Sequence, residues 1–255
     1  MCAIYTSVND PGLESEETQR RKEYMVRLFN YQAPHYDLHD DLIGLGIHRG
    51  WGRDVVREVG RFMQGRRSAY MLDLACGTGF ITFNVARNFT NIRIDAFDIT
   101  PGMIEEANKR KAKKFSQRDI NFWVGDAEIP YGEAKYNLVT TCFAFRNFAN
   151  KNLAAQNVFT ALKPGGTFIL QDMTKPEKGL FRALYLFAFK HLMPLVARLV
   201  GTEKGAPHYL YSSVMSMPKN DDIGLILTSK GFINVHHRYQ SWGMGTQVVA
   251  EKPKE

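Results

Sequence analysis

Through the middle of the chain, from residue 70 to residue 173, short apolar runs rich in β-branched residues alternate with longer segments of helical periodicity. Apolar runs bounded by turn residues predict buried strands, and their alternation with helices is typical of βαβ units in a mostly parallel sheet. The predicted strands span residues 70–76, 92–99, 120–127, 136–143 and 166–173, and the predicted helices span 81–89, 102–115 and 153–162. The pattern therefore predicts an α/β fold with a doubly wound, Rossmann-like sheet.

Local signals mark the ends of two of these helices. Thr100 stands at the expected N-cap of the helix 102–115, and Pro101 stands at its first position. That combination is typical of a helix start. The letters LKPGG at residues 162–166 predict the end of the helix 153–162 and a turn into the next strand.

Two further β-rich runs, 232–240 and 245–253, lie near the end of the chain. A Gly-rich connection joins them instead of a helix, so they predict an antiparallel hairpin. The expected sheet is therefore parallel except for one reversed strand near its edge.

Two segments do not follow the alternation. The segment 16–63 has helical periodicity that is interrupted at APHYD and again between Gly44 and Gly52. The insert 175–219 contains a long apolar run, 180–200, that charged residues and Pro194 interrupt. We expect an amphipathic helix or helix pair over the active site; contact with a membrane interface stays open as an alternative, and the charges disfavour a spanning helix.

Composition narrows the class of protein. With 255 residues and 44% hydrophobic content, the chain can bury the core of one large α/β domain or two small ones. The cysteines, Cys2, Cys76 and Cys142, lack the spacing of a zinc site or a disulfide framework. The polar start, which we expect to be frayed up to Glu16, lacks the pattern of a secretion signal. These features favour a cytoplasmic location, with peripheral membrane contact open.

The net charge of +7 is spread along the chain, with the densest basic runs at residues 20–22 and 109–114. We expect these runs to be exposed helix faces, with attraction to an anionic membrane or substrate as the alternative. The sequence contains no pattern typical of a nucleic-acid-binding module, so no nucleic-acid partner is expected.

The strongest chemical signal is LDLACGTGF at residues 72–80. An apolar strand bearing Asp73 ends in Gly77 and Gly79, whose small size lets backbone N–H groups approach a ligand at the start of the next helix. A dinucleotide fingerprint would place another small residue at position 82, which is Thr82. The pattern therefore disfavours a nicotinamide or flavin cofactor, whereas Asp73 suits a cofactor with a cationic amino-acid end.

Acidic residues follow the next two strands. Asp98 stands at the end of its strand, about twenty residues beyond the glycines, where a carboxylate can accept hydrogen bonds from both ribose hydroxyls of an adenosine. Asp126 and Ala127, in GDAEIP, can contact an adenine edge through a carboxylate and a backbone N–H. Either acidic residue alone would also suit a turn or a helix cap. Because the three corners fall at the carboxyl ends of successive strands, we predict a nucleoside pocket.

With LKPGG before the fifth strand, these residues resemble the class I S-adenosylmethionine-dependent methyltransferases over residues 70–173. The resemblance implies a seven-stranded sheet whose last strand is antiparallel, and S-adenosyl-L-methionine as the cofactor. No metal is expected. The cofactor contacts that it implies are Asp73, Ala75, Gly77, Thr78, Gly79, Asp98, Ile99, Asp126, Ala127 and Phe143.

A closer resemblance extends beyond the cofactor half. Between Phe29 and Phe232, the segments FNYQAPHYD, GLGIHRGW, FAFRNF, LKPGGTFILQDMTKP, LYLFAFKHLMP and HYLYSSVMSMP are similar to the ubiquinone and menaquinone biosynthesis C-methyltransferase family, in that family's order. This likeness implies one methyltransferase domain, residues 1–255. Its parts are a helical cap 1–63, a cofactor-binding core 70–173, a helical substrate-side insert 175–219 and a C-terminal hairpin 232–253.

Several positions depart from the family's pattern. An Asn that usually follows the Tyr-Asp pair is replaced near His39 or Asp40, and Phe80 stands where an Asp usually follows the glycine turn. The C-terminal SWGMGTQVVAEK lacks the more familiar Gly-Gly turn. These departures concern the acceptor rather than the cofactor.

The family resemblance implies C-methylation of a reduced quinol ring, with Arg146, Asn147 and Tyr36 in the catalytic site. Arg146 is suited to stabilise a phenolate or to hold a water that takes the proton. Competing base candidates are His35, His48 and His208, each of which would also suit a surface or structural hydrogen bond. Candidate walls for the acceptor ring are Phe143, Phe145, Phe148 and Trp51, each of which would also suit the core.

A polyprenylated quinol would explain the apolar insert and the basic balance together, because its tail must be shielded from water and taken from a bilayer. Peripheral membrane contact and homodimerisation, which is common in the family, are further expectations. One alternative is a methyltransferase of a soluble small molecule or natural product. An NAD-dependent oxidoreductase is disfavoured by Thr82, and a non-catalytic binding protein is disfavoured by Arg146 and Asn147.

Overall fold

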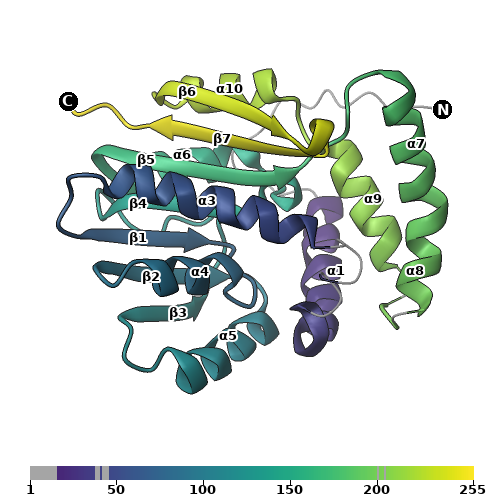
Figure 1. The fold of residues 1–255 in the computed structure, drawn as a ribbon, viewed down its shortest axis with the longest axis horizontal. Helices are drawn as coiled ribbons and strands as arrows, with labels where there is room; N and C mark the ends of the chain where they lie inside the picture. Colours follow the sequence, from purple (N-terminus) through teal and green to yellow (C-terminus); the bar gives the residue numbers. More distant parts are fainter. Residues whose placement is uncertain (1–15, 38–40, 42–45, 200, 204) are drawn as a thin grey trace.

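A seven-stranded sheet forms the centre of the structure, a computed structural model that describes residues 16–37, 41, 46–199, 201–203 and 205–255. The strands lie in the order β3-β2-β1-β4-β5-β7-β6 (Figure 1). Their bounds are Ala69–Leu74 (β1), Ile92–Asp98 (β2), Ile120–Val124 (β3), Tyr136–Cys142 (β4), Leu162–Met173 (β5), Ile233–Gln240 (β6) and Gly245–Glu251 (β7). The predicted fraying before Glu16, Cys2 and the departure near His39 or Asp40 lie outside the described residues.

Neighbouring strands are parallel except at β7, which runs antiparallel to both β5 and β6. The predicted hairpin and the single reversed strand are thus confirmed. The order of the strands reverses between β1 and β4. In an open α/β sheet this is the place where the loops diverge and leave a crevice at the carboxyl ends of the strands.

Helices cover both faces of the sheet. On one face, α3 (Ile47–Met63) and α4 (Phe80–Asn88) pack over Met71 and the residues that share its side. On the other, α6 (Lys151–Ala161) and α10 (Asn220–Ser229) pack over Leu72 and its neighbours. Adjacent strand residues point to opposite faces, so the continuous apolar run of β1 supplies both cores. α5 (Pro101–Lys114) lies beside β2 and β3.

The start of α5 is confirmed in position, but its cap differs from the prediction. Pro101 is in the first turn, yet the side chain of Thr100 makes no capping hydrogen bond. Instead, the N–H of Gly102 donates to Oδ1 of Asn30 at 2.8 Å, from α1 (Glu16–Gln32). A helix N-terminus needs some acceptor for its free N–H groups, and here a side chain 72 residues earlier supplies it.

The N-terminal helices break where the sequence predicts at APHYD, where the 3₁₀ turn η1 (Ala33–His35) follows α1. The second predicted break does not extend to Gly52. α3 begins after Gly46, whose φ is 71°, and continues through Gly52. A Cβ at Gly52 would lie 2.6 Å from the ring of Phe80. This glycine therefore permits close helix contact and does not end a helix.

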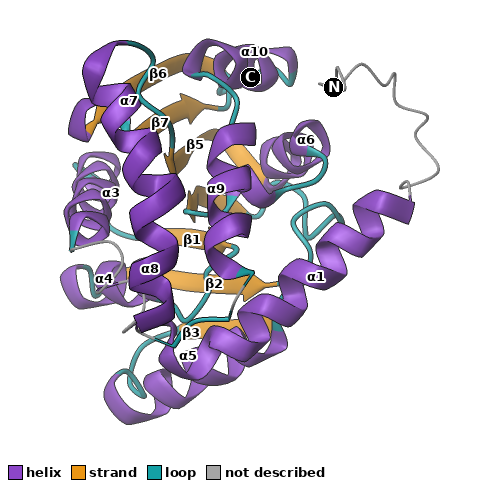
Figure 2. Ribbon diagram, turned by 90° about the vertical axis from the view of Figure 1, so that its right-hand side faces the viewer, coloured by secondary structure: helices purple, strands orange, loops and turns teal. Residues whose placement is uncertain are grey.

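A third group of helices lies beyond the carboxyl ends of the parallel strands. α7 (Gly179–Phe187), the π-helical turn η3 (Ala188–Leu192) and α8 (Met193–Leu199) form one continuous helix, and α9 (Ala206–Ser216) packs beside it. Figures 1 and 2 show these helices and α1 gathered across the strand ends. The helix pair predicted for the insert is confirmed.

Pro194 does not interrupt this helix. Proline removes one N–H and its ring clashes with the carbonyl four residues earlier. The π turn, in which the N–H of Met193 donates to the carbonyl of Ala188, lies directly before it. Such a turn widens the helix locally and lets it continue.

We predict that Gly52→Ala destabilises the protein by about 1–3 kcal/mol, because the added methyl group overpacks against the Phe80 ring. Gly50→Ala is the matched control in the same helix, since a Cβ there would meet only Nη2 of Arg53, at 3.9 Å. It should stabilise by about 0.5–1 kcal/mol, as expected for a helical glycine. Urea unfolding of both variants measures the difference, and equal effects would contradict the packing argument.

Candidate active site

Two cavities open at the carboxyl ends of the parallel strands. The first, of about 110 Å³, is lined mainly by residues that follow β1, β2, β3 and β4. The second, of about 470 Å³, is lined mostly by apolar side chains and is bordered by η3, α8 and α9. Phe29, Tyr36 and Phe143 line both cavities. The two spaces therefore meet at these three residues.

The first cavity collects the residues predicted to contact a cofactor. Asp73, Ala75, Gly77, Thr78, Asp98, Ile99, Asp126, Ala127 and Phe143 all line it. Gly79 is the exception. It is the N-cap of α4 with a φ of 85°, and a Cβ there would lie 2.5 Å from the Phe83 ring. Its role in the structure is to make the turn.

Left-handed backbone shapes the rim of this cavity. Ala75 after β1 and Phe143 after β4 have φ values of 55° and 60°. Non-glycine residues in this region carry strain and cluster at functional sites. Gly77 has a φ of 54°, and a Cβ added there would meet no atom within 4 Å. The loop thus leaves open space beside its backbone.

Asp73 is 1% exposed and ties β1 to two neighbouring elements. Its carboxylate accepts hydrogen bonds from the N–H of Thr82 at 2.9 Å, from Oγ1 of Thr82 at 2.5 Å and from Oγ1 of Thr140 at 2.9 Å. Burial outweighs these bonds and raises the pKa of Asp73 to about 6. The residue that departs from the dinucleotide fingerprint, Thr82, therefore holds this carboxylate. Its contact with the cationic end of a cofactor stays a prediction.

Asp98 organises the loops after β1 and β2. Its Oδ2 accepts from the N–H of Gly77 at 2.9 Å, and its Oδ1 accepts from the N–H of Thr100 at 2.8 Å. Burial raises the pKa of Asp98 despite these two bonds. Each carboxylate oxygen can accept a further hydrogen bond, so the loop contacts leave the group able to receive ribose hydroxyls.

Lys22 joins α1 to the third corner of the cavity. Its Nζ lies 3.2 Å from Oδ2 of Asp126 and 3.0 Å from Oε2 of Glu128, and it lines the cavity itself. The basic run 20–22, predicted to be an exposed helix face, is therefore only partly exposed. The Arg20 side chain is 78% exposed, whereas that of Lys22 is 12% exposed.

These groups fit a nucleoside that carries an amino-acid end. The carboxylates of Asp98 and Asp126 accept hydrogen bonds from hydroxyl and amino groups, and Phe97, Ile99 and Met103 provide apolar surface in the same cavity. In the described part of the chain, no group of three His, Cys, Asp or Glu side chains is placed to hold a metal ion.

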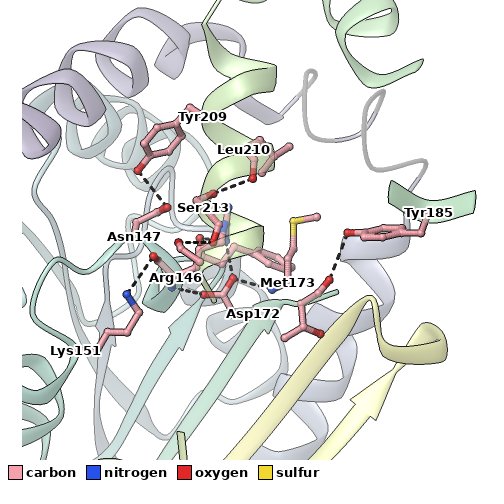
Figure 3. A network of polar contacts seen from close by, with 12 residues as sticks. Arg146, Asn147, Lys151, Asp172, Met173, Tyr185, Tyr209, Leu210 and Ser213 are labelled. Carbon is pink, nitrogen blue, oxygen red and sulfur yellow. Dashed lines mark hydrogen bonds and ion pairs between the residues drawn. The ribbon is translucent and has the colours of Figure 1, made fainter. Parts of the chain in front are cut away.

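A buried ion pair lies where the second cavity meets β5 (Figure 3). The 3₁₀ turn η2 (Phe145–Asn147) follows β4 and carries Arg146, which is 5% exposed. Its Nη1 lies 2.6 Å from Oδ1 of Asp172, and its backbone N–H donates to Oδ2 of Asp172 at 2.8 Å. Burial opposes the guanidinium charge, but the Asp172 carboxylate prevails and raises the pKa of Arg146.

Two further side chains fix the turn around Arg146 through three hydrogen bonds. Nζ of Lys151 donates to the carbonyls of Arg146 at 3.3 Å and Phe148 at 2.8 Å, and the hydroxyl of Tyr209 donates to Oδ1 of Asn147 at 3.1 Å (Figure 3). Nε of Arg146 is buried and has no protein partner among the described residues. The printed side-chain bonds of Arg146 all come from Nη1, which donates to Asp172 and to the carbonyl of Phe143, so within the described residues both Nε–H and Nη2 lack a protein acceptor. Arg146 lines the second cavity.

The predicted aromatic walls divide between core and cavity. Phe143 and Trp51 line the second cavity, whereas Phe148 lines the first. Phe145 is 1% exposed within the core that α6 and α10 cover, so of its two alternatives, wall or core, the structure supports the core.

The three histidines considered as candidate bases lie in different places. His48 lines the second cavity, whereas His35 and His208 are exposed and line neither cavity. Only one of the three predicted base candidates is thus placed beside the acceptor space.

Sequence reasoning did not identify Asp172, Lys22 or Tyr209. A signal was present for Asp172, because Gln171 and Asp172 interrupt an otherwise apolar strand and buried polar residues need partners. The run containing Lys22 carried no signal, since its partners lie 104 residues away or more.

Comparison with known proteins gives a family. The family model described as the ubiE/COQ5 methyltransferase family matches residues 17–252. A demethylmenaquinone methyltransferase from Deinococcus radiodurans is 30% identical over 248 residues, covering 97% of this chain and 99% of that protein. A ubiquinone/menaquinone biosynthesis C-methyltransferase, UbiE, from Geobacter sulfurreducens is 29% identical over 227 residues, covering 88% of this chain and 87% of that protein.

Solved structures share the fold at lower identity. Magnesium protoporphyrin IX methyltransferase from Synechocystis, with bound SAH, has a TM-score of 0.64 at 16% identity and covers 91% of this chain and 99% of its own. A SAM-dependent methyltransferase from Aquifex aeolicus has a TM-score of 0.54 at 15% identity, covering 76% of this chain and 87% of its own. The sheet and its flanking helices are those of Rossmann-like methyltransferases.

We predict that Asp172→Asn lowers the free energy of unfolding by about 3–5 kcal/mol, because it leaves the Arg146 charge buried without its partner. The double variant Arg146→Leu with Asp172→Leu should recover part of that loss. Asp119→Asn is the control, since its ion pair with Arg93 is exposed and should change stability by less than about 1 kcal/mol. Denaturant unfolding measures all three, and a small loss for Asp172→Asn would contradict a charged, buried pair.

Proposed function

The chain belongs to the ubiE/COQ5 methyltransferase family, and on that basis we propose that it transfers a methyl group from S-adenosylmethionine to a ring carbon of a quinol. The relatives described above are named for demethylmenaquinone and for ubiquinone/menaquinone biosynthesis. The observation that carries the proposal is the meeting of two unlike cavities at Phe29, Tyr36 and Phe143. A methyl group can pass between ligands only where their spaces touch.

The first cavity would hold the cofactor. When bound, S-adenosylmethionine supplies an electrophilic methyl group on a sulfonium. We assign ribose recognition to Asp98, adenine recognition to Asp126 and Ala127, and the amino-acid end to the loop 75–79 above Asp73. The ion pairs of Lys22 hold α1 over Asp126 and Glu128, and so cover the cofactor from the N-terminal side.

The second cavity would hold the acceptor ring. A ring carbon becomes nucleophilic when a neighbouring hydroxyl loses its proton, so donors that stabilise the resulting oxyanion favour transfer. Arg146 is fixed by Asp172, and within the described residues its Nε–H and Nη2 groups have no protein acceptor, so they could stabilise that oxyanion. Tyr36, at the junction of the cavities, would orient the acceptor oxygen, and Asn147, which is held by Tyr209 and lines the first cavity, would do so from the cofactor side.

The apolar lining favours an acceptor with a polyprenyl tail over a soluble amine. Phe189, Met193 and Val196, from the continuous helix, line the second cavity with Trp51 and Met244. A buried apolar wall of this kind stabilises a hydrocarbon chain, whereas a charged acceptor would lose its hydration there.

The outer side of the same helix suits a bilayer surface. Exposed apolar side chains that do not line the cavity follow it: Leu180, Leu184, Phe187, Leu195 and Leu199 are 57–80% exposed. Between Gly179 and Leu199 there are two Arg, one Lys and no acidic residue. By length and composition this is the one described helix that could cross a membrane. We place it at the surface because its inner side lines a protein cavity.

We predict that the purified protein converts a demethylquinol into a product one CH₂ heavier when S-adenosylmethionine is supplied. Mass spectrometry of the extracted quinols measures the product. Acceptors with a short prenyl tail should react faster than the tailless quinol, because the second cavity would bury the tail. Calorimetry provides the control: S-adenosylhomocysteine should bind and NAD should not. Methylation of a soluble amine but of no quinol would overturn the proposal.

The membrane proposal has its own test. We predict that the protein floats with vesicles containing anionic lipid, and that Leu195→Glu abolishes flotation by introducing a charge on the exposed apolar face. Leu225→Glu is the matched control, because Leu225 is 67% exposed on α10, away from this helix. Equal flotation of the two variants would count against α8 as the contact. Homodimerisation remains a prediction.

A further inference from the structure

The proposed reaction needs a group that takes the proton of the acceptor's hydroxyl, so this inference rests on the proposed function. The titratable side chains lining the second cavity are Tyr36, His48, Arg146, Tyr185 and Tyr209. The carboxylate of Asp172 keeps Arg146 charged, and burial raises the pKa of Tyr209 to about 12 and that of Tyr185 above its usual value. The ordinary pKa of tyrosine is about 10, whereas that of histidine lies near neutrality. Histidine is therefore the side chain in this set that is suited to act as a base at neutral pH.

His48 lies in the first turn of α3, and its side chain is 14% exposed. Its Nε2 is 3.2 Å from Oδ1 of Asp41, close enough for an Nε2–H to donate to that carboxylate. Its Nδ1 is buried and has no partner among the described residues. The ring packs against Phe80, with the two ring centroids 5.6 Å apart. An imidazole held in this way leaves the Nδ1 lone pair free.

The surroundings of His48 shift its pKa in opposite directions. Burial is the largest influence and lowers its pKa, and Arg49 lowers it as well, whereas Asp41 and Asp37 raise it. The net effect is a pKa below the usual value of 6.5. Arg49 also pairs with Asp41, so that carboxylate is shared between the two side chains. His48 is therefore neutral at neutral pH and able to accept a proton.

We propose that His48 is a catalytic residue, the general base that accepts the acceptor's hydroxyl proton on Nδ1, with Asp41 positioning the ring through Nε2. This arrangement has the general form of a base oriented by a carboxylate. Among the predicted base candidates it is the one beside the acceptor space, since His35 and His208 line neither cavity.

The proton balance of the step is closed. The O–H bond of the acceptor breaks, its electron pair stays on the oxygen beside Arg146, and the proton forms the Nδ1–H bond of His48. The ring carbon's electron pair forms the new C–C bond as the S–CH₃ bond breaks, and that pair remains on sulfur. The hydrogen on the methylated carbon then leaves as a proton to water, and His48 returns its proton to the oxygen. One proton is released for each methyl group transferred.

The first test compares His48→Gln with the wild type. We expect kcat to fall about 100-fold or more, within the range for loss of a general base, while the affinity for S-adenosylhomocysteine is unchanged. The wild-type kcat should rise with pH and level off above the pKa of His48, hence below pH 6.5, and the variant should lack this rise. Added imidazole should restore turnover to His48→Ala. His208→Gln is the matched control and should keep the wild-type profile.

The second test reads the imidazole directly and needs no turnover. In ¹⁵N-labelled protein, we expect the His48 ring to be the Nε2–H tautomer at neutral pH. Because the Asp41 carboxylate raises the pKa of His48, Asp41→Asn should lower that pKa further and weaken the preference for the Nε2–H tautomer. An Nδ1–H tautomer in the wild type would overturn the assignment. The His208 resonances provide the reference for an exposed imidazole.

The two proposals fail in different ways. A wild-type protein that methylates no demethylquinol contradicts the proposed function. A wild-type protein that does so, with a His48→Gln variant that keeps both the rate and the rise with pH, contradicts the role of His48 alone. Thermal unfolding of His48→Gln separates loss of the base from loss of the fold.

Discussion

A guanidinium and a carboxylate lie buried side by side between η2 and the end of β5, and the acceptor side of the site is arranged around them. Arg146 and Asp172 are 5% and 0% exposed, so neither charge can be solvated by water. Burial of a single charge would be strongly unfavourable, whereas the pair satisfies both groups. The carboxylate also accepts the backbone N–H of Arg146. The pair therefore fixes the turn as well as the side chain, and Asn147, in the same turn, is held with it.

The two cavities at the strand ends differ in the side chains that line them. On one side of Phe143, carboxylates held by backbone N–H groups face the first cavity; on the other, apolar side chains from the inserted helices enclose a much larger one. Because the loops after β1 and β4 diverge, a polar and an apolar space can lie next to each other without sharing a core. The N-terminal helix α1 contributes Phe29 to both.

The sequence predicted the strands well because β-branched runs and glycine turns are local signals. The residues predicted to contact a nucleoside line one cavity because each lies directly after a strand. What could not be predicted were contacts between distant segments. Asn30 caps α5, Lys22 pairs with Asp126 and Asp172 pairs with Arg146, and no spacing in the sequence records these partners. For Phe145 the sequence left wall and core open, because an aromatic residue in a buried turn has the same local pattern whether it faces the core or a cavity.

The close contact between Phe80 and Gly52 limits which substitutions the two positions can accept during evolution. The ring of Phe80 occupies the space that a side chain at position 52 would need. The two positions are therefore not free to drift independently: once the aromatic ring was acquired, selection would hold position 52 at glycine. A lineage with a smaller side chain at position 80 would lack that restriction, so the two sites should covary among close relatives.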